Sequence, residues 1–189
     1  MSESLHVTGR YSLNRLFLLY ALFSFFGWVF EVIVLFTETG RYVDRGFLSL
    51  PLCPIYGTAI VGCYLLLGAP QSAGGILRGV SRPSVRVAVY CLTCFLLPTL
   101  IELTVGVAFD KGMGLTLWSY DGFPLNIGGY ICLPVSIVWG TGLFLLMRFC
   151  FLPLKRAVER LPRWIVIPGS IVLALLMGID FIQMIRLSV

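Results

Sequence analysis

The sequence predicts an all-α integral membrane protein with about five transmembrane helices. Of its 189 residues, 58% are hydrophobic and only 12% are charged, whereas a soluble domain carries roughly 25% charged residues. Mean hydropathy is +0.94, and five apolar segments approach the roughly 20 residues that cross a hydrocarbon core about 30 Å thick. The expected helices, in one transmembrane domain over residues 1–189, are about 13–36, 51–69, 86–108, 130–152 and 164–187.

Lysine and arginine are unevenly distributed along the chain. With a cytoplasmic N-terminus, ten of the 14 lie on the inner side, and four lie outside: Arg41, Arg45, Lys111 and Arg186. Inner loops carry the positive excess in membrane proteins, so the sequence predicts a multi-pass protein of the cell membrane with its C-terminus outside. The net charge of +5 is then a topology signal, and we expect no binding to nucleic acid. The first segment lacks a small-residue cleavage site and is expected to remain as a helix.

The stretch RGFLSLPLCPIYG, residues 45–57, places Pro51 and Pro54 at the entrance to the second helix. The uninterrupted run 55–68 would form about 21 Å of helix, which is too short to cross the membrane. In one reading the helix begins at Pro51, with both prolines in its first turn, where a missing N–H costs little. In the other, residues 48–53 are irregular, partly re-entrant chain, which is tolerated at membrane depth only inside protein or beside a wet cavity. The sequence leaves both readings open.

Three acidic residues, Glu31, Glu102 and Asp180, lie within apolar segments, and the predicted helix directions place all three in the outer half of the membrane. Glu31 ends a helical stripe of small and polar residues that begins at Ser24, and Glu102 follows Thr99. Both glutamates are therefore expected to face the helix bundle and not the lipid. Asp180 is the weaker candidate because it lies close to the end of its helix.

A charged side chain at mid-membrane costs about 2.5–3.5 kcal/mol on insertion scales. The two glutamates therefore need partners, and the sequence leaves three kinds open. One is a structural ion pair, such as Glu31 with Arg45 or Arg41. The others are a proton- or cation-handling site and a site for a polar ligand.

The second outer loop reads LWSYDGFPLNIGGYICL, residues 117–133. Its Trp118 and Tyr120 suit an aromatic belt at the headgroup level. Asp121 and Asn126, among glycines and Pro124, indicate turns that expose backbone N–H groups beside a helix N-terminus, which favours anions. We expect an outward-facing polar cavity. Its candidate binding residues are Glu31, Glu102, Arg45, Tyr56, Trp118, Tyr120, Asp121 and Asn126.

The cysteines and the single histidine restrict the chemistry. Cys53 and Cys132 both lie near the expected outer surface, where a disulfide between them is one alternative. Cys91 and Cys94, spaced i and i+3 in an apolar helix, indicate packing. His6 is the only histidine, which disfavours a histidine-based metal centre or a catalytic triad. The sequence predicts no metal and no cofactor, and it contains no Walker A pattern or dinucleotide glycine fingerprint.

Three stretches and one single residue carry a resemblance to a known family. They are SFFGWVFEV (24–32), RGFLSLPLCPIYG (45–57), Glu102, and WSYDGFPLNIGGYICLPVSIVWG (118–140). In these the chain resembles the CmpB-like putative ABC-transporter membrane proteins, a family of small bacterial integral membrane proteins. It departs from the family pattern at Leu50, where a glycine usually precedes the first proline, and at Tyr130, which replaces a common arginine. The hydroxyl and acidic residues around the loop tyrosine are also exchanged, as Ser119 and Asp121. The resemblance implies transport.

Three functions are open at this level. The first is a transport or permease-type component, supported by the intramembrane acids, the interrupted helices and the resemblance. The second is a membrane enzyme that acts on a lipid or lipid-linked substrate at the outer leaflet, because carboxylates and the loop cluster on one face. The third is a non-catalytic accessory or binding subunit. The lipid bilayer is the expected partner, together with a second copy of the chain or partner transporter subunits.

Overall fold

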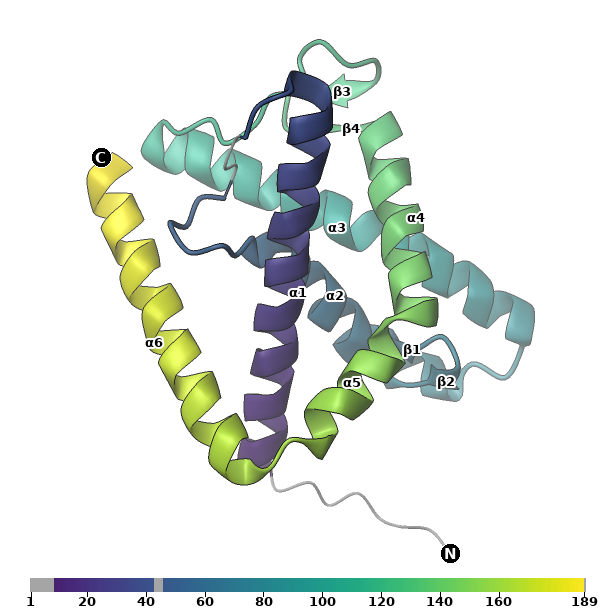
Figure 1. Ribbon diagram of the computed structural model, residues 1–189. Coiled ribbons are helices and arrows are strands. Elements are labelled where there is room, and N and C mark those ends of the chain that lie inside the picture. The colour runs from purple at the N-terminus through teal and green to yellow at the C-terminus, as the bar shows by residue number, and fades with distance from the viewer. Residues whose placement is uncertain (1–8, 43–45, 189) are drawn as a thin grey trace, which may run out of the picture.

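The computed structural model of the protein describes residues 9–42 and 46–188 and is almost entirely helical (Figure 1). The predicted all-α fold is confirmed. The helices, including one short 3₁₀ helix, η1, are α1 (Gly9–Thr39), α2 (Pro54–Leu67), η1 (Gly75–Gly79), α3 (Pro83–Met113), α4 (Leu133–Phe149), α5 (Phe151–Arg160) and α6 (Arg163–Ser188). Two antiparallel pairs of two-residue strands join them, β1 (Gly68–Ala69) with β2 (Ser72–Ala73) and β3 (Asn126–Ile127) with β4 (Ile131–Cys132).

Three helices, α1, α3 and α6, are long and apolar enough to cross a membrane. The bent pair α4–α5 qualifies as a fourth span when it is taken as one unit, whereas α2 is shorter. All five predicted apolar segments contain a helix, but complete spans within residues 9–42 and 46–188 number three or four instead of five. The lipid-facing surface is apolar as well, since large hydrophobic side chains such as Leu175 and Ile33 are more than half exposed on α6 and α1.

The second helix begins at Pro54, so the reading in which it starts at Pro51 is wrong. The backbone N–H of Cys53 donates to the carbonyl oxygen of Ser24 on α1, over 2.9 Å, and does not enter a helical ladder. Cys53 is in extended conformation and Pro54 occupies the first turn of α2, a position where its missing N–H is harmless.

The chain before α2 returns deep into the molecule (Figure 1). Ser24 lies 15 residues before Thr39, the last residue of α1, and therefore about 22 Å from that end of the helix. Leu48 and Leu52 are buried and pack with Met177 of α6. The backbone N–H of Leu50 donates to Asp180 Oδ2 over 3.0 Å. Residues 46–53 thus form a re-entrant segment held between α1 and α6.

The predicted single helix over residues 130–152 is instead two helices. The chain bends by 50° between α4 and α5, and α5 continues through residues that were expected to form a loop. Pro153 has no N–H to donate to the carbonyl of Phe149, so a straight helix would lose this bond. The bend at Cys150 follows from that proline. The other predicted helices begin and end within five residues of the observed bounds of α1, α3 and α6.

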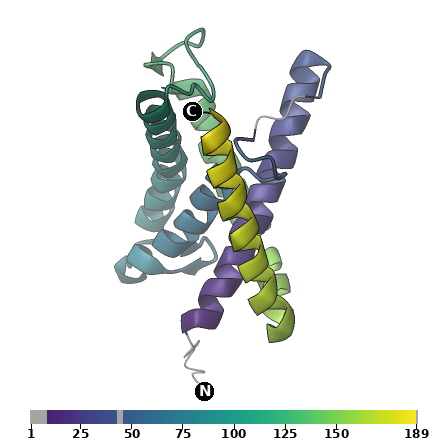
Figure 2. The same cartoon turned by 90° about the vertical axis from the view of Figure 1, so that its left-hand side faces the viewer.

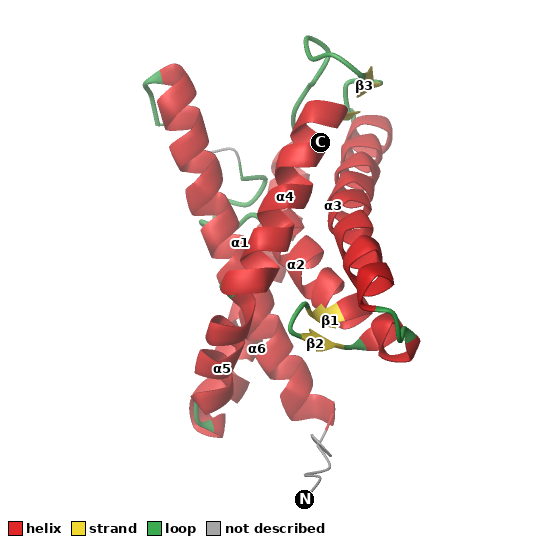
Figure 3. Ribbon diagram, turned by 90° about the vertical axis from the view of Figure 1, so that its right-hand side faces the viewer, coloured by secondary structure: helices red, strands yellow, loops and turns green. Residues whose placement is uncertain are grey.

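Helix packing divides the molecule into two groups, one with α1, α2 and α6 and the other with α3 and α4. The α1 helix packs mainly on α2 and α6, whereas α3 packs mainly on α4; Figure 2 shows α6 crossing α1, and Figure 3 shows α3 beside α4. A Cβ atom at Gly57 would lie 2.4 Å from Ser24 Oγ, and one at Gly140 would lie 2.9 Å from Phe95 Cα. Both helix pairs therefore depend on a glycine at the point of closest approach.

The two ends of the molecule differ. The loop end consists of residues 114–132 with the last turns of α1 and α6, and the hairpin end consists of residues 68–79 with the first turn of α1 and the α5–α6 junction (Figures 1 and 3). The main apolar core joins helices α1 to α5 and η1. At its centre the Phe151 ring stacks on Phe23, with centroids 5.7 Å apart, and contacts Tyr64 at 4.6 Å.

We predict that Gly57→Ala destabilises the protein, although alanine favours a helix over glycine by about 1 kcal/mol. The added methyl group would overlap Ser24 and the backbone of Tyr20, and overpacking of this kind costs about 1–3 kcal/mol. Gly62→Ala is the matched control on the same helix, since its nearest neighbour would lie at 3.7 Å. Thermal unfolding in detergent should show a lower midpoint for Gly57→Ala and an equal or higher one for Gly62→Ala. Equal midpoints for the two variants would contradict the close packing.

Candidate functional site

The first acidic residue of the site, Glu31, is bonded to Tyr56. The Tyr56 hydroxyl of α2 donates to Glu31 Oε1 of α1 over 2.6 Å. Gly27, one turn before Glu31, leaves the necessary space, because a Cβ atom there would lie 2.3 Å from the Tyr56 ring. The small-residue stripe of α1 therefore allows the tyrosine to lie flat on the helix and reach the carboxylate one turn further on.

The second acidic residue, Glu102, is bonded to Tyr120. The Tyr120 hydroxyl donates to Glu102 Oε1 over 2.7 Å, and burial, together with this bond, raises the pKa of Tyr120. The tyrosine consequently remains a protonated donor. Glu102 is only 7% exposed, and its Oε2 atom is buried with no hydrogen-bond partner among the residues that the structure describes.

The two pairs lie close enough to interact. Glu31 interacts electrostatically with Glu102 and with Tyr120, and Tyr56 interacts with Tyr120. The structure thus brings four of the residues singled out in the sequence into one group, which we call the carboxylate–tyrosine cluster: Glu31, Tyr56, Glu102 and Tyr120. Its members come from α1, α2, α3 and the loop before β3.

An aromatic residue missed as a site candidate, Trp139, lies against this cluster. Its ring makes edge contacts with Tyr56 at 5.1 Å and with Phe30 of α1 at 5.5 Å. Trp139 therefore connects α4 to the helix pair α1–α2.

Asp121 and Asn126 shape the loop and are not bonded to the glutamates. Ser119 Oγ donates to Asp121 Oδ2 over 2.6 Å. The Asn126 side chain donates to the Phe123 carbonyl over 2.9 Å and accepts the N–H of Gly129 over 3.3 Å. These bonds define the turn that presents Tyr120 to Glu102.

Trp118 bonds two parts of the same loop to each other, and Tyr130 bonds the loop to α3. The Trp118 indole N–H donates to the carbonyl of Tyr130 over 2.9 Å, and the Tyr130 hydroxyl donates to Asp110 Oδ2 over 2.6 Å. Lys111 lies 2.9 Å from the same Asp110 oxygen. The Tyr130–Asp110 pair was not anticipated, although Asp110 follows Glu102 by eight residues and so lies on a similar face of α3.

Two other sequence predictions concern Arg45 and the cysteines. Arg45 lies outside the described residues, so its proposed place beside Glu31 stays a prediction. All six cysteines are described and none forms a disulfide, so the alternative of a bond between Cys53 and Cys132 is not realised in this structure. The sulfur atoms of Cys63 and Cys94 are 3.9 Å apart in the core. Among the described residues, no group of three or more acidic, cysteine or histidine side chains is placed to hold a metal ion.

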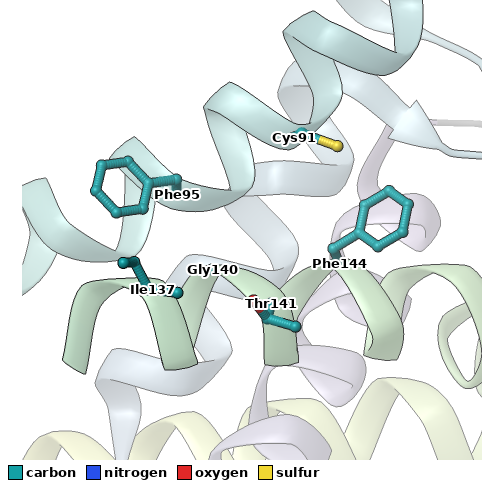
Figure 4. Close-up of a pocket in the computed structure, with 6 residues that line it drawn as sticks. All are labelled: Cys91, Phe95, Ile137, Gly140, Thr141 and Phe144. Carbon is teal, nitrogen blue, oxygen red and sulfur yellow. The ribbon is translucent and has the colours of Figure 1, made fainter. Parts of the chain in front are cut away.

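The structure has a cavity of about 210 Å³ between α3 and α4 (Figure 4). It is lined by Cys91, Phe95, Ile137, Gly140, Thr141 and Phe144. A second cavity lies at the hairpin end and is lined by residues of α2, β1 and η1. Neither of these two cavities is lined by Glu31 or Glu102, so the expected polar cavity around the glutamates stays a prediction.

Comparison with known proteins identifies one family. The family model described as "Putative ABC-transporter type IV" matches residues 18–185, a range that includes every member of the carboxylate–tyrosine cluster. The CmpB-like resemblance of the sequence motifs is thereby confirmed. Comparisons with curated proteins and with solved structures give no significant match.

We predict that Tyr120→Phe destabilises the protein more than Tyr130→Phe. The first change removes the hydroxyl donor of a buried carboxylate, and leaving such a group unsatisfied costs about 1–3 kcal/mol. The second removes a donor from Asp110, which keeps Lys111 as a partner. Unfolding midpoints of the two variants in detergent, measured beside the wild type, check the order. A larger loss for Tyr130→Phe would mean that the Tyr120–Glu102 bond contributes little.

Proposed function

The chain belongs to the family described as "Putative ABC-transporter type IV", and from this premise we propose that it is a transport or permease-type component of the cell membrane. In this proposal the carboxylate–tyrosine cluster binds a proton or a cation. The observation that carries it is the buried Glu102 Oε2, which lacks a partner among the described residues. An unpaired buried charge costs several kcal/mol, so a proton or a cation at this oxygen is strongly favoured.

The position of the cluster between two helix groups supports a transport role. Glu31 and Tyr56 belong to the pair α1–α2, whereas Glu102 and Tyr120 belong to α3 and the loop that leads into α4. Two ionised glutamates repel each other across this boundary, and a proton or cation between them removes the repulsion. A bound proton or cation therefore favours the conformation in which the two helix groups lie close together. Such a difference in ligand affinity between two conformations is what a conformational transport step requires.

For Glu102, the alternative of a purely structural ion pair has less support than the binding of a proton or a cation. Its bonded partner is a neutral phenol and not a cation. Donation by Tyr120 satisfies one carboxylate oxygen and leaves the other available. The tyrosine holds the carboxylate in place without neutralising it, an arrangement suited to binding and releasing a positive charge.

The proposal includes further subunits. Three or four candidate spans form a small permease, so a second copy of the chain or partner transporter subunits would complete the pathway. The sequence has no Walker A pattern, so ATP hydrolysis would belong to such a partner. The short α5 helix, with Arg156 and Arg160 exposed at the hairpin end, is the candidate contact surface for it.

We further propose that the hairpin end is cytoplasmic and the loop end faces outward, because ten of the 14 basic residues belong to the hairpin side. In this orientation the carboxylate–tyrosine cluster lies toward the outer side of the membrane.

This orientation predicts the labelling of two introduced cysteines, Gly122→Cys at the loop end and Gly79→Cys at the hairpin end. Both positions are exposed, and an added Cβ atom meets nothing within 4 Å. In intact cells a membrane-impermeant maleimide should modify Gly122→Cys, whereas Gly79→Cys should react only after the cells are opened. The wild type, with its native cysteines, gives the background. The reverse pattern would refute the orientation.

We predict that Glu102→Gln abolishes proton or cation flux while the protein still folds. The amide keeps the acceptor for Tyr120 but cannot be protonated to neutrality or carry the charge that attracts a cation. Proteoliposomes with a pH-sensitive or cation-sensitive dye inside, given an external pulse of acid, Na⁺ or K⁺, should show flux with the wild type. With Glu102→Gln the flux should fall to the level of protein-free liposomes.

Glu159→Gln is the matched control, because it is the same chemical change at an exposed residue on α5. It should leave the flux unchanged. Thermal unfolding separates the two readings of Glu102, since loss of a structural pair lowers the midpoint whereas removal of a functional charge leaves it unchanged or raises it. Full flux in Glu102→Gln together with a lower midpoint would assign the residue to structure alone.

A further inference from the structure

The second cavity lies at the end of α2, and Leu67, the last residue of this helix, is about 16 Å along it from Tyr56. Its volume is about 380 Å³, within the roughly 300–1,000 Å³ that is usual for small-ligand sites. The lining residues are Tyr64, Leu65, Gly68, Ala69, Gly74, Gly75 and Arg78. The cavity is therefore separate from the carboxylate–tyrosine cluster and belongs to the hairpin end.

The cavity is lined by one charged side chain, Arg78 of η1. Arg78 makes no ion pair with any residue that the structure describes. Lys155 of α5 lies 5.8 Å from the centre of the Tyr64 ring, which also lines the cavity, and is paired with Glu159.

Three glycines, Gly68, Gly74 and Gly75, line the cavity, so part of its wall consists of backbone atoms. Gly75 has a φ of +49°, and a Cβ atom there would lie 2.0 Å from the carbonyl oxygen of Leu66, so only glycine allows this approach to the end of α2. The Gln71 side chain donates to the carbonyl of Arg148 and ties the hairpin to the end of α4. The hairpin is thus held against α2 and α4 at a constant distance.

Arg78 is not needed to satisfy the end of α2. The carbonyl of Leu67 accepts the N–H of Gly74 over 2.9 Å, and the carbonyl of Gly68 accepts the Tyr90 hydroxyl over 3.1 Å. The carbonyl at the end of α2 and the one after it therefore have donors from the hairpin and from α3. The guanidinium N–H donors of Arg78 remain available to an external acceptor.

We propose that this cavity binds a phosphate group, and that its ligand is the headgroup of an anionic phospholipid. Guanidinium groups match phosphate oxygens with two parallel hydrogen bonds, and basic pockets between membrane helices bind such headgroups. Leu65 lines the cavity and is 59% exposed on the apolar surface of α2. An acyl chain can therefore lie along Leu65 while the phosphate contacts Arg78.

The test uses the full chain in detergent and measures its unfolding midpoint with added lipid. Phosphatidylglycerol should raise the midpoint of the wild type, and the zwitterionic phosphatidylcholine at the same concentration should raise it much less. Arg78→Gln should weaken phosphatidylglycerol binding by about 10- to 100-fold, because hydrogen bonds to a charged group are lost. Arg82→Gln removes the same charge from an exposed position outside the cavity and should bind phosphatidylglycerol as the wild type does.

A test with inorganic phosphate distinguishes the two possible ligands of the cavity, a phospholipid headgroup and free phosphate. If phosphate alone protects the wild type as well as phosphatidylglycerol does, and Arg78→Gln removes the effect, the cavity is a phosphate site but not a lipid site, and the lipid assignment is overturned. Equal shifts with both lipids, or an unchanged shift in Arg78→Gln, overturn the whole proposal.

A second variant covers the case in which Arg78→Gln does not fold. Arg78→Lys keeps the positive charge but loses the planar fork, so it should fold and bind phosphatidylglycerol more weakly than the wild type. Native mass spectrometry, which counts the lipids retained on the protein, provides the second measurement. Retention of phosphatidylglycerol by Arg78→Lys at the wild-type level would contradict the proposal, because it would show that the planar guanidinium group does not recognise the phosphate.

Discussion

The backbone hydrogen bond from Cys53 to Ser24 determines most of the geometry around it. Inside a bilayer an unsatisfied N–H group costs several kcal/mol, so non-helical chain persists there only when protein groups accept its donors. Ser24 supplies such an acceptor on α1, and Asp180 supplies another for Leu50 on α6. With these donors satisfied, the re-entrant segment can enter the molecule and begin α2 near the middle of α1.

That starting point places the tyrosine at its glutamate. Side chains in a helix lean toward its N-terminus, and α2 runs opposite to α1. Tyr56, in the first turn of α2, therefore leans toward the C-terminal end of α1, passes Gly27 and reaches Glu31. A helix that began at Pro51 would move Tyr56 by about one turn and break this match. The proline-rich stretch thus sets both the length of α2 and the partner of Glu31.

The three intramembrane acids are stabilised in different ways, and the difference separates structure from candidate function. Asp180 accepts a backbone N–H and holds the re-entrant segment. Glu31 and Glu102 each accept a tyrosine hydroxyl, and of these Glu102 keeps a buried oxygen without a donor among the described residues. Arg78 at the hairpin end is the opposite case, a cation that has no ion pair with any described residue. These are the two places where an external ion or headgroup gains the most free energy on binding.

Local properties of the sequence determined the all-α membrane fold, the approximate helix positions, the family, and Glu31, Glu102 and Tyr120 as notable residues. Hydropathy and helical spacing act over a few turns and can be read along the chain. The start of α2, the role of Asp180 and the partners of the glutamates depended on contacts between residues 18 to 130 positions apart. Asp121 and Asn126 likewise proved to be bonded within their own loop. Such choices were decided only by the tertiary structure, because the donor that a buried group finds depends on which helices pack together.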